Sequence, residues 1–178
     1  MNTPAEARNV YLVGMPGAGK TTIGRQLARR LGRTFRDLDH EIEASTGVGI
    51  PIIFEFEGES GFRKRESEML ALLASASGQV VATGGGAVLR PENREAMKRS
   101  GVVVYLSAEP AVLYERTRLD QNRPLLRVEN PMQTLVNLHE QRDPLYREVA
   151  DLVISAPGGH PGRLVRRLEK ELGERCAS

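Results

Sequence analysis

The sequence predicts an α/β fold in which a five-stranded parallel sheet is covered by helices on both faces. Short apolar runs alternate with amphipathic helical patterns from one end of the chain to the other, and strands separated by helices are typical of parallel sheets. The composition is that of a globular protein, with 40% hydrophobic and 27% charged residues. A length of 178 residues fits a single domain spanning residues 1–178.

Each expected element has a local signature in the sequence. Five short, mostly apolar runs predict the strands, which are residues 9–14, 34–39, 79–86, 102–107 and 151–155. Apolar residues at intervals of three and four predict the helices, which are residues 20–32, 40–47, 51–78, 91–101, 109–118, 131–150 and 162–173. Gly32 marks the end of the first helix, Gly58 and Gly61 are expected to break the third, and Pro91 lies in the first turn of the fourth.

The segment between the first strand and the first helix, Gly14-Met-Pro-Gly-Ala-Gly-Lys-Thr21, fits the phosphate-binding pattern G-x-x-x-x-G-K-[ST]. Its glycines let backbone N–H groups turn inward around an anion, and the following helix adds its positive N-terminal end. Lys20 is expected to reach the outer phosphates, and the Thr21 hydroxyl to bind Mg²⁺. A chance glycine turn is the alternative, but the segment lies between a strand and a helix, as phosphate binding requires. The residues expected to bind ATP here are Gly14, Gly17, Ala18, Gly19, Lys20, Thr21 and Thr22.

Two aspartates, Asp37 and Asp39, stand two residues apart at the end of the second expected strand. Side chains at i and i+2 of a strand point to the same side, and ligands of open parallel sheets bind beyond the strand ends. One carboxylate can therefore help to hold Mg²⁺, and the other can accept a proton from an attacking hydroxyl group. The structural alternative is that Asp39 caps the helix that follows.

Further candidates for anion binding lie outside these motifs. Arg63 follows Phe62 in a segment of mixed charges, where the alternative is a solvated helix face with ion pairs between turns. Gly84, Gly85 and Gly86 end the third strand and leave backbone N–H groups accessible to a ligand's oxygens.

Two arginines in the second half of the chain are weaker candidates. Arg123 lies in a polar segment, residues 119–130, that is broken by Pro124, and it is a candidate for a lid arginine that stabilises transferred charge. Arg142 precedes Pro144 on the expected helix at 131–150, and its position alone favours a surface residue.

Composition and charge disfavour several classes of protein. The chain has no run of about 18 apolar residues, so no membrane span is expected. Residues 1–8 lack the apolar core of a signal peptide, and the single cysteine, Cys176, cannot form an internal disulfide. A net charge of +2 gives no argument for nucleic acid. We therefore expect a cytoplasmic protein.

In their order and spacing, these motifs resemble those of the shikimate kinases. They are the phosphate-binding segment, Asp-x-Asp, G-E-x-x-F-R-x-x-E at 58–66, G-G-G at 84–86, R-P-L-L at 123–126 and R-x-P-L-Y at 142–146. The resemblance extends from about Val10 to Leu168. It implies a three-layer P-loop kinase fold, with a mobile lid at about 117–129 and an acceptor-binding region at about 39–66.

The resemblance also implies an activity. The enzyme would transfer the γ-phosphate of ATP to the 3-hydroxyl of shikimate in chorismate and aromatic amino-acid biosynthesis, as a monomer with one Mg²⁺ per active site. Asp39 would bind the acceptor hydroxyls and act as base or orienter. Arg63 and Arg142 would bind the shikimate carboxylate. The N–H groups of Gly84–Gly86, Gly85 above all, would bind a substrate hydroxyl.

For the nucleotide, the resemblance assigns four further roles. Lys20 and Arg123 would act on the transferred phosphate, with Arg123 closing over it as part of the lid. Asp37 would hold Mg²⁺ through water, and Arg116 would lie against the adenine.

Two stretches depart from the family pattern. Residues 155–162 are glycine-rich where some relatives have a polar side chain beside the adenine, so backbone is expected to replace side chain there. Pro51 and Ile52 stand where relatives more often have helix-forming residues, which is expected to alter the first turn of that helix and to leave Phe54 as a pocket wall.

Two other functions remain open on the sequence. One is a kinase for another small hydroxylated acid such as gluconate, which would not need the D-x-D, F-R-x-x-E and G-G-G motifs together. The other is a nucleotide-dependent switch or regulatory ATPase, which would need switch loops and a water-positioning residue in place of a second polar site.

Overall fold

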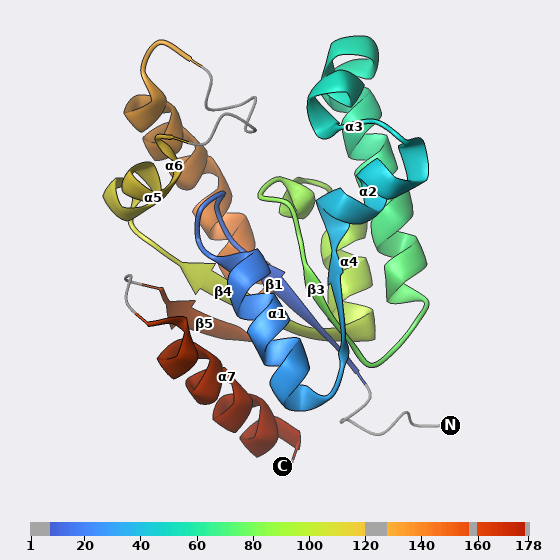
Figure 1. Ribbon diagram of the computed structural model, residues 1–178, viewed down its shortest axis with the longest axis vertical. Helices are drawn as coiled ribbons and strands as arrows, with labels where there is room; N and C mark the ends of the chain where they lie inside the picture. The colour runs from blue at the N-terminus through green and yellow to red at the C-terminus, as the bar shows by residue number, and fades with distance from the viewer. Residues whose placement is uncertain (1–7, 120–127, 157–159, 177–178) are drawn as a thin grey trace.

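The computed structural model of the protein describes residues 8–119, 128–156 and 160–176. At its centre is a five-stranded sheet with the order β2-β3-β1-β4-β5, in which every neighbouring pair is parallel (Figure 1). The strands are β1 (Asn9–Val13), β2 (Thr34–Asp37), β3 (Gln79–Ala82), β4 (Gly101–Ser107) and β5 (Leu152–Ser155). The predicted parallel sheet of five strands is confirmed.

Helices cover both faces of the sheet. In Figure 1, α1 (Lys20–Leu31) and α7 (Pro161–Cys176) lie in front of it, and α4 (Pro91–Ser100) and α6 (Pro131–Val149) lie behind. Two helical regions project beyond the carboxyl ends of the strands, namely α2 (Leu38–Thr46) with the first part of α3 (Ile50–Ala74), and α5 (Pro110–Thr117) with the first turns of α6. The site described below lies between these two projections.

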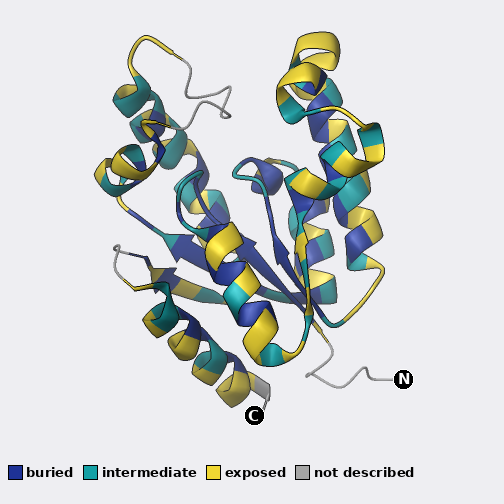
Figure 2. Cartoon of the chain, viewed as in Figure 1, coloured by how far each residue is buried: buried dark blue, intermediate teal, exposed yellow. Residues whose placement is uncertain are grey.

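The central strands form the core of the protein. Every residue of β1 and β3 is buried, whereas the edge strand β2 has only partly buried and exposed residues and the edge strand β5 has one buried residue, Ile154 (Figure 2). A continuous apolar run such as β1 is what a strand covered on both faces requires. This packing gives the loops at the strand ends a rigid base.

The second expected strand is shorter than predicted, and this changes the setting of its two aspartates. The strand ends at Asp37, and Asp39 lies in the first turn of α2. The reason is local, because Asp37 Oδ1 accepts a hydrogen bond of 3.2 Å from the N–H of His40 and so caps the helix. The two side chains therefore do not share one side of a strand. The alternative in which Asp39 is the cap is also wrong.

Helix α3 shows one of the two predicted breaks. Gly58 has φ 70° and ψ −178°, a non-helical conformation that kinks the helix there, whereas Gly61 is helical. Pro51 lies in the first turn of α3, where its missing N–H leaves no hydrogen bond unmade. Phe54 lines the pocket, as expected, and its ring lies 4.8 Å from that of Phe62.

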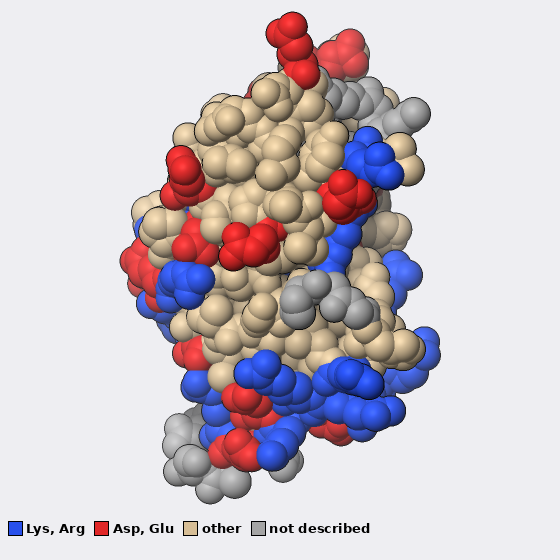
Figure 3. Space-filling view, turned by 90° about the vertical axis from the view of Figure 1, so that its left-hand side faces the viewer, with Lys and Arg blue, Asp and Glu red and all other residues tan. Residues whose placement is uncertain are grey.

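The surface charges are unevenly distributed. Figure 3 shows Lys and Arg side chains gathered over the lower part of the face that carries α7. Acidic residues accompany them, since Arg30 pairs with Glu169 and Arg167 with Glu171. Within the described ranges, no helix has the length and apolar character needed to cross a membrane.

Candidate active site

A cleft of about 1230 Å³ opens at the carboxyl ends of the strands. It is bounded by the loop after β1, by α2 and α3, by the turn after β3, and by α6 and α7. Of the predicted site residues, those lining it are Gly17, Ala18, Gly19, Lys20, Thr21, Thr22, Asp37, Asp39, Arg63, Gly84, Gly85, Gly86, Arg116 and Arg142. Gly14 lies at the base of the loop, and Arg123 and most of the expected lid lie outside the described residues.

The loop after β1 has the conformation of a phosphate-binding loop. Gly17 and Gly19 have φ of 88° and 95°, which side chains disfavour, and Gly19 directly precedes α1. The Lys20 ammonium donates hydrogen bonds to the carbonyls of Gly14 and Met15 at 2.6 and 2.9 Å. The lysine is buried, with 8% of its surface exposed. A concentrated positive charge thus lies inside the loop, beside the N-terminus of a helix.

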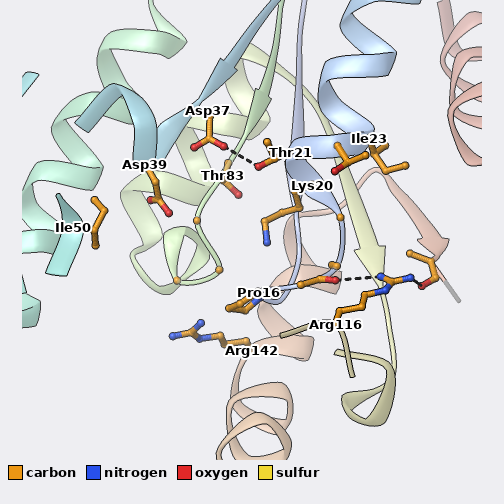
Figure 4. Close-up of a pocket in the computed structure, with 18 of the residues that line it drawn as sticks. Pro16, Lys20, Thr21, Ile23, Asp37, Asp39, Ile50, Thr83, Arg116 and Arg142 are labelled. Atoms are coloured by element: carbon orange, nitrogen blue, oxygen red, sulfur yellow. Dashed lines mark hydrogen bonds between the residues drawn. The ribbon is translucent and has the colours of Figure 1, made fainter. Parts of the chain in front are cut away.

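The two residues predicted to bind metal lie together. The Thr21 hydroxyl donates a hydrogen bond of 2.8 Å to Asp37 Oδ2 (Figure 4). A hydroxyl and a carboxylate oxygen are the hard ligands that Mg²⁺ takes, with water and phosphate oxygens completing its shell. Among the described residues, no cluster of three or more His, Cys, Asp or Glu could hold a metal by itself. The donor set therefore fits an ion that arrives with a nucleotide.

Asp39 faces the phosphate loop from α2. Figure 4 shows its side chain and that of Lys20 pointing into the same space. Oδ1 of Asp39 is buried and has no hydrogen-bond partner within the described part of the chain. The pKa of Asp39 is raised to about 6, chiefly by burial and then by the negative charges of Glu66 and Asp37, while the positive charge of Lys20 lowers it. A carboxylate in this setting is a strong hydrogen-bond acceptor for a hydroxyl group.

Arg63 is held on the inner face of α3 by a buried acidic partner. Its Nη1 donates to Glu66 Oε1 at 2.9 Å, and its Nη2 lies 3.4 Å from Glu59 Oε1. Glu66 is fully buried, and burial raises its pKa while Arg63 lowers it. The alternative of a solvated helix face is wrong for Arg63. It holds for Lys64, which is exposed and lies 4.0 Å from Glu68, while Arg65 is partly exposed and pairs with Glu57 at 2.6 Å.

Glu66 was missed as a site residue at the sequence level. The signal was present, because Phe62, Arg63, Glu66 and Leu70 recur at helical spacing, and all four are buried. Oε2 of Glu66 and Nε of Arg63 find no hydrogen-bond partner among the described residues. The pair therefore keeps hydrogen-bonding capacity that a ligand can use.

Arg142 is buried, with 3% of its surface exposed. Its position in the sequence alone favoured a surface residue, and this expectation is wrong because α6 packs behind the sheet and presents Arg142 to the cleft. Figure 4 shows its side chain beside Pro16 of the phosphate loop. Two arginines 79 positions apart in the chain, Arg63 and Arg142, thus line one cleft.

In the turn after β3, the carbonyl groups and the N–H groups of the glycines differ in their hydrogen bonding. The carbonyls of its glycines all accept hydrogen bonds: Gly84 from the Ala87 N–H at 3.1 Å, Gly85 from the Tyr146 hydroxyl at 2.5 Å, and Gly86 from the Leu89 N–H at 3.1 Å. Their three N–H groups donate to no acceptor in the described part of the chain. The predicted open N–H groups are therefore present.

Other site residues also occupy the space that side chains on these glycines would need. A Cβ on Gly84 would lie 3.0 Å from Glu66 Oε2 and 3.1 Å from Asp39 Oδ1. A Cβ on Gly85 would lie 3.1 Å from Arg142 Nη1, and one on Gly86 would overlap the Arg63 guanidinium. The acidic and basic groups of the cleft pack directly against the turn.

Arg116 connects the phosphate loop to the segment after β5. Its guanidinium donates to the carbonyls of Gly17 and Ala156 at 3.1 and 3.4 Å. It lines the cleft together with His160 and Pro161 at the start of α7. Residues 157–159 of the glycine-rich stretch lie outside the described residues.

A family model for shikimate kinase matches residues 16–172 of the chain. The chain belongs to the shikimate kinase family. It is 56% identical to a shikimate kinase of Aromatoleum aromaticum over 92% of this chain and 93% of that protein. It is 58% identical to one of Dechloromonas aromatica over 90% of this chain and 86% of that protein.

Solved shikimate kinases have the same fold. The enzyme from Acinetobacter baumannii in complex with shikimate has a TM-score of 0.93, 51% identity and 94% coverage of both chains. The enzyme from Bacteroides thetaiotaomicron has a TM-score of 0.87 and 35% identity, and the match covers 94% of this chain and 99% of that one. The predicted family and the predicted P-loop kinase fold are confirmed.

Proposed function

We propose that this chain is a shikimate kinase, which transfers the γ-phosphate of ATP to the 3-hydroxyl of shikimate in chorismate and aromatic amino-acid biosynthesis. The observation that carries the proposal is the pairing, in one cleft, of a phosphate-binding loop with a second polar site. That site contains two buried arginines and a carboxylate whose Oδ1 has no partner among the described residues. A regulatory ATPase has no use for such an acceptor site.

In this proposal, the nucleotide phosphates bind in the loop from Gly14 to Thr22. The backbone N–H groups and the N-terminus of α1 hold the phosphate oxygens. Lys20 leaves its contacts with loop carbonyls to bind the outer, β- and γ-phosphates, where its charge stabilises the transition state. Thr21 and Asp37 would hold Mg²⁺, which when bound neutralises phosphate charge.

The carboxylate of shikimate binds between Arg63 and Arg142. Guanidinium groups bind carboxylates through two parallel hydrogen bonds, which fix orientation as well as position. The ion pair with Glu66 sets the rotamer of Arg63 before substrate arrives. The open N–H groups of the glycine turn bind a hydroxyl of the ring.

The acceptor hydroxyl binds to Asp39. In the transfer step, the 3-oxygen attacks the γ-phosphorus, the bond to the β,γ-bridging oxygen breaks, and ADP leaves with the bonding electron pair. The hydroxyl proton passes to the Asp39 carboxylate, whose raised pKa makes it a better acceptor than an ordinary aspartate. We further propose that Arg123 and the segment at about 117–129 close over the phosphates, that Arg116 lies against the adenine, and that the enzyme is a cytoplasmic monomer.

A coupled assay of ADP release tests the proposal. The protein is mixed with MgATP and shikimate, gluconate or no acceptor. We expect a high rate of ADP release only when the acceptor is shikimate. The phosphorus NMR spectrum of the product should show one resonance coupled to the proton at carbon 3. Equal rates with gluconate would indicate another acid kinase, and equal rates without acceptor would indicate an ATPase.

A further inference from the structure

Two stacked tyrosines lie behind the glycine turn. The rings of Tyr105 on β4 and Tyr146 on α6 are 4.9 Å apart at an angle of 30°, and both residues are buried. Their hydroxyl groups bind in different places. Tyr105 donates to Asp143 Oδ1 at 2.6 Å, on α6 itself, whereas Tyr146 donates to the carbonyl of Gly85 at 2.5 Å, 61 residues away. Only the second bond reaches the cleft.

The Tyr146 hydroxyl fixes a peptide group that flanks Gly85. A trans peptide is planar, so holding the Gly85 carbonyl toward α6 points the N–H of Gly86 in the opposite direction. The preceding peptide is fixed in the same way, because the Gly84 carbonyl accepts from Ala87. Glycines have the largest choice of backbone conformations. A turn of three glycines therefore needs such external hydrogen bonds to stay in a single conformation.

Tyr146 is also one helical turn from Arg142, on the same face of α6. Arg142 Nη1 lies where it would contact a Cβ on Gly85. Burial raises the pKa of Tyr146, and the positive charge of Arg142 opposes this. The Tyr146 hydroxyl and the Arg142 guanidinium therefore reach the same glycine of the turn from one face of α6.

We propose that Tyr146 is a positioning residue for the acceptor, which holds the Gly85 carbonyl and orders the glycine turn beside Arg142 so that the open N–H groups face the substrate. This inference rests on the proposed function, since it assumes that shikimate occupies the cleft beside the turn. The residue itself touches no substrate in this arrangement.

The test compares Tyr146→Phe with Tyr105→Phe. Each change removes one buried, hydrogen-bonded hydroxyl from one ring of the same stacked pair, so the two are matched in size, burial and packing. We expect Tyr146→Phe to raise the shikimate KM and Kd about tenfold, the order expected when a buried carbonyl loses its donor. The ATP KM and the ADP Kd should stay within about twofold. Tyr105→Phe should leave the shikimate Kd unchanged.

Four outcomes are decisive. Weaker shikimate binding in Tyr146→Phe alone supports the inference. If the wild type binds shikimate and the two variants have equal shikimate Kd values, the inference is overturned and the proposed function still stands. A loss shared equally by shikimate and ADP would also overturn it, because a merely structural role has that effect. A wild type that binds no shikimate would remove both the proposed function and the inference.

A second measurement keeps the inference testable if Tyr146→Phe fails to fold. The amide resonances of Gly85 and Gly86 in ¹⁵N-labelled wild-type protein are followed during titration with shikimate. They should be among those that shift most, and they should shift far less with ADP. Absence of any shikimate-dependent shift at these two amides would overturn the inference.

Discussion

The two halves of the cleft are built in opposite ways. Most of the phosphate side comes from one continuous segment, the loop from Gly14 to Thr22, and its reactive groups already have protein partners: Lys20 binds loop carbonyls and Thr21 binds Asp37 of the neighbouring β2. The acceptor side draws its groups from α2, α3, the turn after β3, and α6. Several of its polar atoms, among them Asp39 Oδ1 and Glu66 Oε2, have no hydrogen-bond partner among the described residues.

This difference indicates how each half responds to its ligand. The phosphate side exchanges existing hydrogen bonds for bonds to phosphate, so its geometry is set before ATP arrives. The acceptor side carries buried polar atoms that have no hydrogen-bond partner within the described ranges, and these atoms cost free energy until a ligand binds them. Substitutions on the phosphate side should therefore affect nucleotide binding or the chemical step. Substitutions of the acceptor-side arginines should affect the binding of the acceptor.

The largest effect is expected on the phosphate side. Lys20→Ala should lower turnover by about 10³-fold or more, because a cation that contacts transferring phosphate in a dry site contributes several kcal/mol. Shikimate affinity should change far less, because the ammonium of Lys20 donates hydrogen bonds to the carbonyls of Gly14 and Met15 in the phosphate loop. Single-turnover transfer and circular dichroism on the same sample check this. A folded variant with near-normal turnover would exclude the loop from the reaction.

Asp39→Asn should lower turnover by roughly 10²–10⁴-fold, the usual contribution of a general base, although a loose transition state needs less help. Shikimate binding should change much less, since a carboxamide still makes a hydrogen bond to the hydroxyl. Wild-type turnover should fall as the pH is lowered through about 6, the pKa of Asp39. If Asp39→Asn weakens shikimate binding as much as it lowers turnover, the assignment of Asp39 to the chemical step is wrong.

Arg63→Ala and Arg142→Ala should each weaken shikimate binding by about 10- to 100-fold and leave ATP binding nearly unchanged, since each removes charge-assisted hydrogen bonds to a carboxylate. Replacement by Lys should also weaken binding, because the two-pronged geometry is lost. Calorimetric titration with each ligand checks this, and Lys64→Ala, on the exposed face of the same helix, is the control. A parallel loss of ATP affinity would show that the acceptor assignment is wrong.

The buried carboxylate should also shape stability. The pKa of Asp39 rises from 3.8 to about 6 on folding, so the unfolded state releases this proton at lower pH than the folded state does. The free energy of unfolding should therefore fall as the pH rises from about 4 to 6, by at most about 3 kcal/mol. Asp39→Asn should lack this slope and be the more stable protein at pH 7.5. Urea unfolding between pH 4 and 8 measures it, and identical slopes would contradict the burial of the charge.

The smallest effect is expected for Asp37→Asn. The variant should need several-fold more Mg²⁺ for half-maximal turnover, and saturating Mg²⁺ should restore most of the rate, because the ion has other ligands on water and phosphate. Turnover measured over a range of Mg²⁺ concentrations checks this. Rescue of Asp39→Asn, but not of Asp37→Asn, by added Mg²⁺ would reverse the two roles.

The same contrast explains what could be predicted from the sequence. The phosphate loop is contiguous, so its motif revealed Lys20 and Thr21 directly. Alternation of strands and helices was enough for the sheet. Burial of Arg142 depends on how α6 packs behind the sheet, which no local pattern contains. The strand pattern did not place Asp39 correctly, because the cap formed by Asp37 begins a helix there. Its individual role was predicted from the resemblance.

Two further features depend on contacts between distant segments. Helical spacing places Glu66 among the buried residues of α3, but its position against Gly84, in the turn after β3, depends on how that helix packs. The bond from Tyr146 to Gly85 joins α6 to the turn after β3, and nothing in either segment indicates the other. Such contacts are set by tertiary packing of the sheet and its helices.

The central claim is that the cleft holds two separable sites, one for phosphate and one for a hydroxylated carboxylate. The most direct test is a crossed calorimetric experiment, in which shikimate and MgADP are titrated separately into wild type, Lys20→Ala and Arg142→Ala. We predict that Lys20→Ala weakens only MgADP binding and that Arg142→Ala weakens only shikimate binding, by at least tenfold in each case. Equal losses for both ligands in both variants, or no binding of shikimate to the wild type, would contradict it.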